Sequence, residues 1–312
     1  MRTLRKVLVV LVALALTVVA GVGIRYRDQI YRYATHRKGG PAVTTPWAPV
    51  GGPGGAPELH LAVVGDVGDA GSRLDLIASA VAKVDGRAAF DGLVVLGDDA
   101  YPSGDPNELD STVFGPFAPV LDRGAELFAV LGNHDVMHGN GPAVAAALGM
   151  PGRWWAAHLG DVLLVGLDSN QPDDPRQMAW LERTLATTNE PWRIVALHHP
   201  PYSSGYHGSN GEVQAAFAPL FERYGVQLVL SGHEHDYQRS VPIDGTTYVV
   251  SGGASGSRGT GEEAFTAAAY GWLHFVELSL FPDRIVVRAI GADLGVGDEA
   301  SIPSGRRAAS TP

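Results

Sequence analysis

The chain has 312 residues, of which 45% are hydrophobic, and carries 23 Lys or Arg against 33 Asp or Glu, a formal charge of −10. This size and apolar content suffice for one large domain with a full core. Cysteine is absent, which excludes a disulfide scaffold and leaves His and carboxylate side chains as metal ligands. Residues 39–312 hold 15 basic and 32 acidic residues, a charge of −17 that argues against nucleic-acid binding.

The N-terminal region is hydrophobic and bordered by basic residues. Residues 7–24 form an uncharged run that follows Arg2, Arg5 and Lys6. The length suits a short membrane-spanning helix or the apolar part of a secretory signal, with small residues for cleavage near position 20. We expect residues 1–24 to be a signal anchor or signal peptide. The protein is then exported, either membrane-anchored with its folded domain outside the cytoplasm or, the less favoured alternative, secreted after signal cleavage.

Three further segments follow. Residues 25–57 combine a basic stub with a Gly/Pro-rich linker, and the folded domain is predicted over 58–297. Residues 298–312 are small and polar, so we expect a disordered tail.

Within the domain, apolar strands alternate with helical patterns. Strand 59–64, helix 72–84 and strand 93–96 form a β-α-β unit, which predicts parallel pairing and an α/β class. Further elements are predicted at 127–131, 154–158, 162–167 and 192–197, at 226–230, 247–250, 273–280 and 284–290 (strands), and at 178–186 and 213–224 (helices).

Five of these strands end in short runs of Asp, Asn or His. The residues are Asp66, Asp98, Asn133 with His134, His198 with His199, and His233 with His235. Taken singly, each is better explained as a turn residue, a helix cap or a buried histidine. Because open α/β sheets gather their ligands outside the carboxyl ends of strands, the five together favour a metal centre.

The ligand types indicate two different ions. Asp oxygens with the Tyr101 phenol and one His favour a hard, highly charged ion, whereas an Asn oxygen with two His suits a borderline divalent one. His233 and His235 are two residues apart and can serve different ions, and Asp98 can bridge them.

These motifs resemble those of the calcineurin-like metallophosphoesterases, and within them the purple acid phosphatases. The resemblance runs from about residue 59 to 255 and is carried by Gly65-Asp66-Val67-Gly68, Gly97-Asp98-Asp99-Ala100-Tyr101, Gly132-Asn133-His134-Asp135, Val195-Ala196-Leu197-His198 and Gly232-His233-Glu234-His235. Most members of the wider family have His where this chain has Gly68, and Tyr101 stands where purple acid phosphatases place a compensating phenolate. The resemblance implies a four-layer α/β/β/α sandwich of two mixed sheets.

The resemblance also implies two metal ions and their ligands. Fe(III) would be held by Asp66, Asp98, Tyr101 and His235, and Fe(II), Zn or Mn by Asp98, Asn133, His198 and His233. His134 would face the substrate phosphate, and His207 would be a second such residue unless it is an exposed loop histidine. His199 and Glu234 receive no role.

The function so implied is hydrolysis of small phosphate monoesters by a metal-bound hydroxide, as in acid phosphatases. A phosphodiesterase or nucleotide hydrolase with the same centre is the alternative. A non-catalytic binding module is a third reading, and it predicts lost ligands. The membrane is an expected partner through an uncleaved N-terminal helix, and the oligomeric state is open.

Overall fold

The computed structural model describes residues 31–32, 34–36, 38–51 and 55–304.

The first sheet is built on three parallel strands. Strand β2 (Leu59–Val64) leads through helix α3 (Ser72–Asp85) to β3 (Gly92–Val95), and β4 (Glu126–Ala129) pairs parallel to β3. The predicted β-α-β unit is therefore present.

Two seven-stranded mixed sheets face each other. The first has the order β1-β14-β13-β12-β2-β3-β4 and the second the order β11-β9-β10-β8-β7-β6-β5. The remaining strands of the first sheet are β1 (Thr45–Pro46), β12 (His274–Leu280), β13 (Arg284–Gly291) and β14 (Gly295–Pro303). The second sheet comprises β5 (Trp155–Leu159), β6 (Val162–Gly166), β7 (Trp192–Leu197), β8 (Leu228–Ser231), β9 (Tyr237–Ser240), β10 (Thr247–Ser251) and β11 (Thr266–Tyr270).

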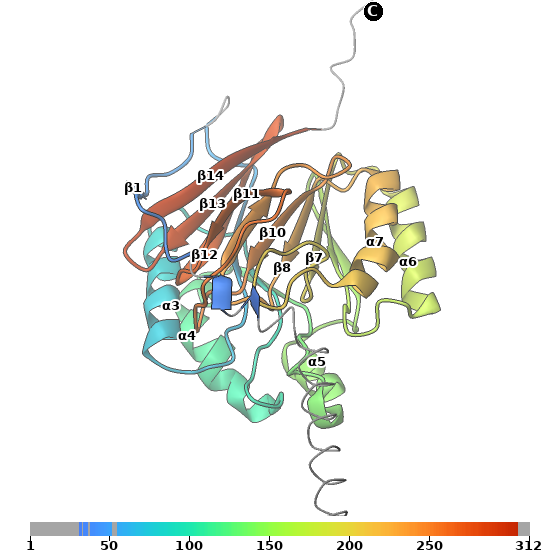
Figure 1. Cartoon of the computed structure of the whole chain (residues 1–312), viewed down its shortest axis with the longest axis horizontal. Helices are drawn as coiled ribbons and strands as arrows, with labels where there is room; N and C mark the ends of the chain where they lie inside the picture. The colour runs from blue at the N-terminus through green and yellow to red at the C-terminus, as the bar shows by residue number, and fades with distance from the viewer. Residues whose placement is uncertain (1–30, 33, 37, 52–54, 305–312) are drawn as a thin grey trace, which may run out of the picture.

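Helices cover the outer face of each sheet (Figure 1). Helices α3 and α4 (Gly115–Leu121) pack on the first sheet, and α6 (Pro175–Thr187) and α7 (Gly211–Tyr224) pack on the second. The short helices are α5 (Gly141–Ala147), η1 (Pro106–Glu108), η2 (Asp110–Phe114) and η3 (Met137–Gly139). The four-layer α/β/β/α class is confirmed.

Alternation along the strands builds three hydrophobic layers. In β2, Leu61 and Val63 point between the sheets, while Ala62 and Val64 point at α3. All six residues of β2 are buried, because a parallel strand inside a sandwich is covered on both faces. Such a scaffold fixes the ends of β2, β3, β4, β7 and β8.

The domain extends beyond both predicted boundaries. Inside the expected linker, β1 pairs with β14, and Trp47 is 6% exposed with its Nε1 donating to Glu277 Oε2 over 3.0 Å. The predicted disordered tail from Asp298 is likewise wrong up to Pro303, because those residues form the second half of β14. Asp298 also binds Arg239 with both carboxylate oxygens, at 2.7 and 3.0 Å, which ties β14 to the second sheet.

The hydrophobic run at 7–24 lies outside the described residues. Among the residues that the structure does describe, no helix has the length and apolarity needed to cross a membrane.

Trp47 provides a test of the earlier domain boundary. We expect Trp47→Ala to lower the free energy of unfolding by about 3 kcal/mol, because the substitution removes a large buried side chain and leaves a cavity in its place. Urea denaturation measures the change. Val43→Ala is the matched control: Val43 is 79% exposed, and its truncation should change stability by less than about 0.5 kcal/mol. Equal midpoints for Trp47→Ala and the parent chain would show that the linker contributes nothing.

Candidate metal centre

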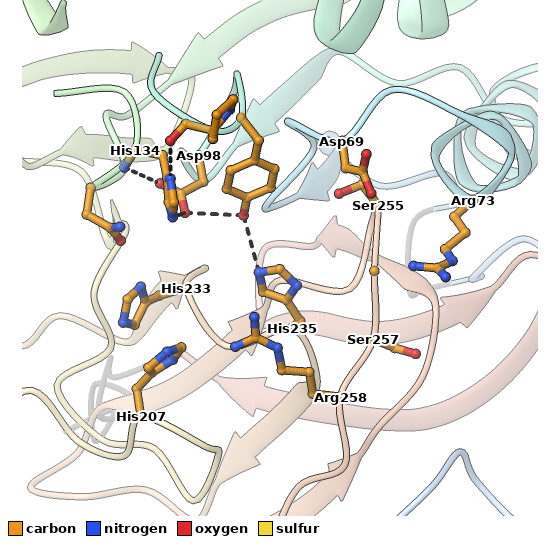
Figure 2. Close-up of a pocket in the computed structure, with 14 residues that line it drawn as sticks. Asp69, Arg73, Asp98, His134, His207, His233, His235, Ser255, Ser257 and Arg258 are labelled. Carbon is orange, nitrogen blue, oxygen red and sulfur yellow. Dashed lines mark hydrogen bonds and ion pairs between the residues drawn. The ribbon is translucent and has the colours of Figure 1, made fainter. Parts of the chain in front are cut away.

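The polar strand ends meet around one cavity. Asp66 follows β2, Asp98 follows β3, Asn133 follows β4, His198 follows β7, and His233 follows β8. A cavity of about 540 Å³ opens at this edge of both sheets. Its lining includes Asp98, Tyr101, Asn133, His134, His207, His233 and His235 (Figure 2).

One group of ligand atoms surrounds the Tyr101 hydroxyl. This oxygen lies 3.1 Å from Asp66 Oδ1, 3.2 Å from Asp98 Oδ2 and 3.2 Å from His235 Nε2. Asp66 Oδ1 and His235 Nε2 are 3.4 Å apart. Two carboxylates, a phenol and an imidazole therefore converge on a single point.

A second group surrounds His198 Nε2. This nitrogen lies 3.1 Å from Asn133 Oδ1, 3.2 Å from His233 Nδ1 and 3.4 Å from Asp98 Oδ1. The Asp98 carboxylate thus directs Oδ2 to the first group and Oδ1 to the second. Each of its oxygens is available to a different ion.

Three of these residues have backbone conformations in the left-handed region, which direct their side chains into the cluster. Asp66, Asp98 and His233 have φ values of 57°, 56° and 70°. Such conformations cost on the order of 1–3 kcal/mol each in residues other than glycine, and persist where the surroundings enforce them. Three strained residues at three strand ends are typical of a functional site.

Glycines leave the room that the carboxylates occupy. A Cβ on Gly132 would lie 2.1 Å from Asp98 Oδ1. A Cβ on Gly68 would lie 2.8 Å from both Asp98 O and Tyr101 N, because Gly68 is hydrogen-bonded to the turn that carries Tyr101. In this backbone the turn with the phenol occupies the place where a side chain at position 68 would start.

Asp135 holds the metal-facing turns together. Its buried carboxylate accepts hydrogen bonds from the backbone N–H of Asp98, Asp99, Ala100 and Gly132. No role in the site was predicted for this residue from sequence. A carboxylate that binds four amides from two strand ends instead fixes the distance between those ends.

The histidine rings are oriented by backbone oxygens. His198 Nδ1 lies 2.8 Å from Leu96 O, which leaves Nε2 for the cluster. His134 Nδ1 lies 2.6 Å from Pro102 O, and its Nε2 is 3.9 Å from Asp98 Oδ2. A histidine fixed in this way through one nitrogen offers the other to a metal or a substrate.

The electrostatics of the cluster call for a cation. Burial, together with the charge of Asp98, raises the pKa of Asp66 well above its usual range. Burial lowers the pKa of His233 and, with Arg258, brings the pKa of His235 to about 4, so both imidazoles are neutral at pH 6. In the described part of the chain, no Lys or Arg forms an ion pair with Asp66 or Asp98. Neutral imidazoles beside buried, mutually repelling carboxylates fit metal ions.

The loop after β7 brings His207 to the same cavity. Its ring centroid lies 4.4 Å from that of His233, and its backbone N–H donates to Glu234 Oε1 over 2.7 Å. Glu234 also accepts from Gly208 N, so this buried carboxylate positions the loop. His207 therefore lies at the cavity and is not a distant loop histidine.

Sequence reasoning gave His199 no role and did not single out two arginines near the cluster. His199 has one ring nitrogen within 4.8 Å of those of His198 and His233, and hydrogen-bonds Ser169. Arg73 and Arg258 line the cavity wall, from the start of α3 and the loop after β10. Their place could not be read from motifs, because loop conformation brings them in.

The fold and the geometry of the site are those of a metallophosphoesterase. The model of the calcineurin-like phosphoesterase family matches residues 59–237, and the chain belongs to this family. Tartrate-resistant acid phosphatase type 5 of Oryctolagus cuniculus is 29% identical over 248 residues, which cover 66% of this chain and 75% of that protein.

Solved structures with this fold include a purple acid phosphatase and an anchor protein. Purple acid phosphatase PPD1 from yellow lupin (Lupinus luteus) seeds matches with a TM-score of 0.69 and 19% identity, over 78% of this chain and 53% of that one. GAP50, the anchor in the inner membrane complex of Plasmodium, matches with a TM-score of 0.71 and 17% identity, over 80% and 90%. At these identities the likeness is one of fold.

Gly132 allows a direct test of the cluster. Gly132→Ala places a methyl group 2.1 Å from Asp98 Oδ1 and 2.2 Å from Asp98 N, so Asp98 must shift, and we expect metal affinity to fall at least about tenfold. Competition with a chelator measures this affinity. Gly211→Ala is the control, since a Cβ at that helix start has nothing within 4 Å. Unchanged affinity in Gly132→Ala would place the metal elsewhere.

The raised pKa of Asp66 predicts proton release. Burial and the charge of Asp98 raise the pKa of Asp66, which favours the protonated carboxyl in the metal-free protein, and a bound cation displaces this proton because ligands must be deprotonated. Zn²⁺ titrations in two buffers of different ionisation enthalpy should differ by the heat of transferring the protons that the cation displaces. Identical heats in both buffers would contradict the assignment of Asp66 as a ligand.

Proposed function

We propose that this chain is a phosphatase that hydrolyses phosphate monoesters at a dinuclear metal centre. The observation that carries the proposal is the shared carboxylate: Asp98 presents one oxygen to each of two ligand groups. Two-metal hydrolases use such a bridge to hold their ions a few ångströms apart.

The donor atoms support different ions in the two positions. Asp66, Asp98, Tyr101 and His235 would hold Fe(III), whose high charge suits carboxylate and phenolate oxygens. Asp98, Asn133, His198 and His233 would hold Fe(II), Zn or Mn. When bound, such ions polarise the phosphoryl oxygens and activate a water molecule.

His134 has the geometry of a proton donor to the leaving group. Its Nδ1 is engaged by Pro102 O, so Nε2 faces the cavity beside Asp98. A protonated Nε2 at this place would transfer its proton to the leaving alkoxide. His207 lines the same cavity and would hydrogen-bond a phosphoryl oxygen through its ring, since Glu234 keeps its loop in place.

The fold alone does not establish catalysis, since GAP50 is described as an anchor and matches it well. The non-catalytic reading predicts missing ligands. Here all seven candidate ligand residues converge within hydrogen-bonding or ion-pair distance of one another or of Asp98. This complete set favours an enzyme.

The alternative substrate class is a phosphodiester or nucleotide, for which the same centre would serve. The rabbit relative named above favours the monoester, because it is an acid phosphatase. We also propose that the hydrophobic run at 7–24 exports the protein and, if uncleaved, anchors it, so that the phosphatase acts outside the cytoplasm on small phosphorylated molecules.

The activity test compares monoester with diester on metal-reconstituted protein. At acidic pH we expect hydrolysis of p-nitrophenyl phosphate to exceed that of bis-p-nitrophenyl phosphate. His134→Ala should lower kcat by about 100-fold with metal content unchanged, because it removes proton transfer alone. His138→Ala, an exposed histidine on the same loop, serves as control. Loaded protein that hydrolyses neither ester would refute the phosphatase, and a faster diester reaction would select the alternative.

The ferric position has a spectroscopic test. A phenolate bound to Fe(III) gives a charge-transfer band in the visible range, as the family resemblance implies. Iron-loaded protein should therefore be coloured and Tyr101→Phe colourless. A colour that survives this substitution would remove Tyr101 from the ligand set.

A further inference from the structure

Two arginines line the cavity without serving the proposed chemistry. Arg258 and Arg73 share this wall with His233 and His235 (Figure 2). The chain after residue 38 carries a net charge of −17, so cationic side chains are in the minority there. Two of them line this cavity together with the Asp69 carboxylate, so this side of the site holds two positive charges and one negative charge.

Arg258 is positioned but unpaired. Its backbone N–H donates to His235 O over 2.7 Å, and its guanidinium lies 5.5 Å from the Tyr206 ring centroid. Within the described ranges, no carboxylate lies at ion-pair distance from Arg258, whereas Arg239 pairs with Asp298 and Arg288 pairs with both Glu277 and Glu299. A guanidinium held over an aromatic ring loses little freedom on binding an anion.

Arg73 extends the same wall. It stands in the first turn of α3, and it too has no ion pair with any carboxylate the structure describes. A Cβ on Gly256 would lie 3.3 Å from His235 Nδ1 and 4.0 Å from Arg73 Nη1, so this glycine separates the two. In Figure 2, the Arg258 guanidinium turns toward His235 and His207, while that of Arg73 lies beyond the segment with Ser255 and Ser257.

We propose that Arg258, with Arg73 farther out, binds a second anionic group carried by the leaving group of the substrate. The preferred substrates are then phosphate esters whose alcohol part bears a carboxylate or another phosphate. Guanidinium groups bind both anions through paired, charge-assisted hydrogen bonds. This inference rests on the proposed phosphatase function, since it takes the metal centre as the place of the transferred phosphate.

Binding of phosphonates, whose C–P bond cannot be hydrolysed, tests the inference without turnover. The three probes are propylphosphonate, 3-phosphonopropionate, in which a carboxylate replaces the methyl group, and ethane-1,2-bisphosphonate, in which a second phosphonate does. Calorimetry on Zn²⁺-loaded protein gives each Kd. We expect at least one doubly anionic probe to bind about tenfold more tightly than propylphosphonate, and comparing the two shows whether carboxylate or phosphate is preferred.

Three variants show which arginine causes the difference in Kd between the doubly and singly anionic probes. Arg258→Gln should bring the ratio of Kd values to within about twofold of unity, and Arg73→Gln should reduce it in part. Arg183→Gln is the matched control, because Arg183 is exposed on α6 away from the cavity, and it should keep the full ratio. Chelation of Zn²⁺ by the second anion would persist in Arg258→Gln, so the variant separates it from arginine binding.

The outcomes distinguish failure of the anion-site inference from failure of the phosphatase proposal. A parent protein that does not discriminate between the probes, or a ratio that Arg258→Gln leaves intact, overturns the inference. Hydrolysis of p-nitrophenyl phosphate is scored separately on the same samples. Discrimination without hydrolysis would refute the phosphatase and keep the anion site, and hydrolysis without discrimination would do the reverse.

Discussion

The site depends on the repulsion between two buried carboxylates. Asp66 and Asp98 both contact the Tyr101 hydroxyl, and no described cationic side chain pairs with either. Placing two like charges in a buried site is unfavourable unless a cation compensates them. The surrounding structure maintains this arrangement: Asp135 ties the strand ends through four amides, and glycines at 68 and 132 leave space for the carboxylate of Asp98 and the turn after it. The fold therefore holds two buried carboxylates in an arrangement that a bound cation would stabilise.

The scaffold explains how such strain is tolerated. Five strand ends from two sheets carry candidate ligands, and the sheets are joined by a hydrophobic layer and by the Asp298–Arg239 pair. Arg239 lies on β9, the strand that starts two residues after His235. Strand β14 therefore contacts, through Asp298, the strand that follows His235. Residues 298–303, which composition alone assigned to a tail, are part of the folded domain.

Much of this could be predicted from sequence because buried strands and their polar ends are local signals. The run 59–64 followed by Asp66, and its repetition at Asp98 and Asn133, predicted the parallel core and the edge where the ligands meet. Strands β1, β9, β11 and β14 were missed. Strands β1 and β11 lie at sheet edges, β9 is a short strand between β11 and β10, and β14 is a largely polar strand between β1 and β13. Pairing with distant segments, rather than their own pattern, makes them strands. Trp47 was missed for the same reason, since its burial depends on Glu277 and the first sheet.

The second layer of the site was also beyond sequence reasoning. Asp135 and Glu234 act through backbone amides, and such roles leave no motif of their own. The cavity wall with Arg258 depends on how the loop after β10 folds against His235. The strand ends and their donor atoms, by contrast, indicated a centre for two different ions before any geometry was known, and the family resemblance implied which residues would hold each ion.

Metal stoichiometry of Asp98 variants tests the central claim most directly. Elemental analysis of reconstituted protein should give about two ions per chain in the parent and in Asp69→Ala, a carboxylate of the same cavity that belongs to neither ligand group. Asp98→Ala should lose both ions, because its two oxygens belong to both groups. An Asp98→Ala protein that folds and still holds two ions would contradict the account.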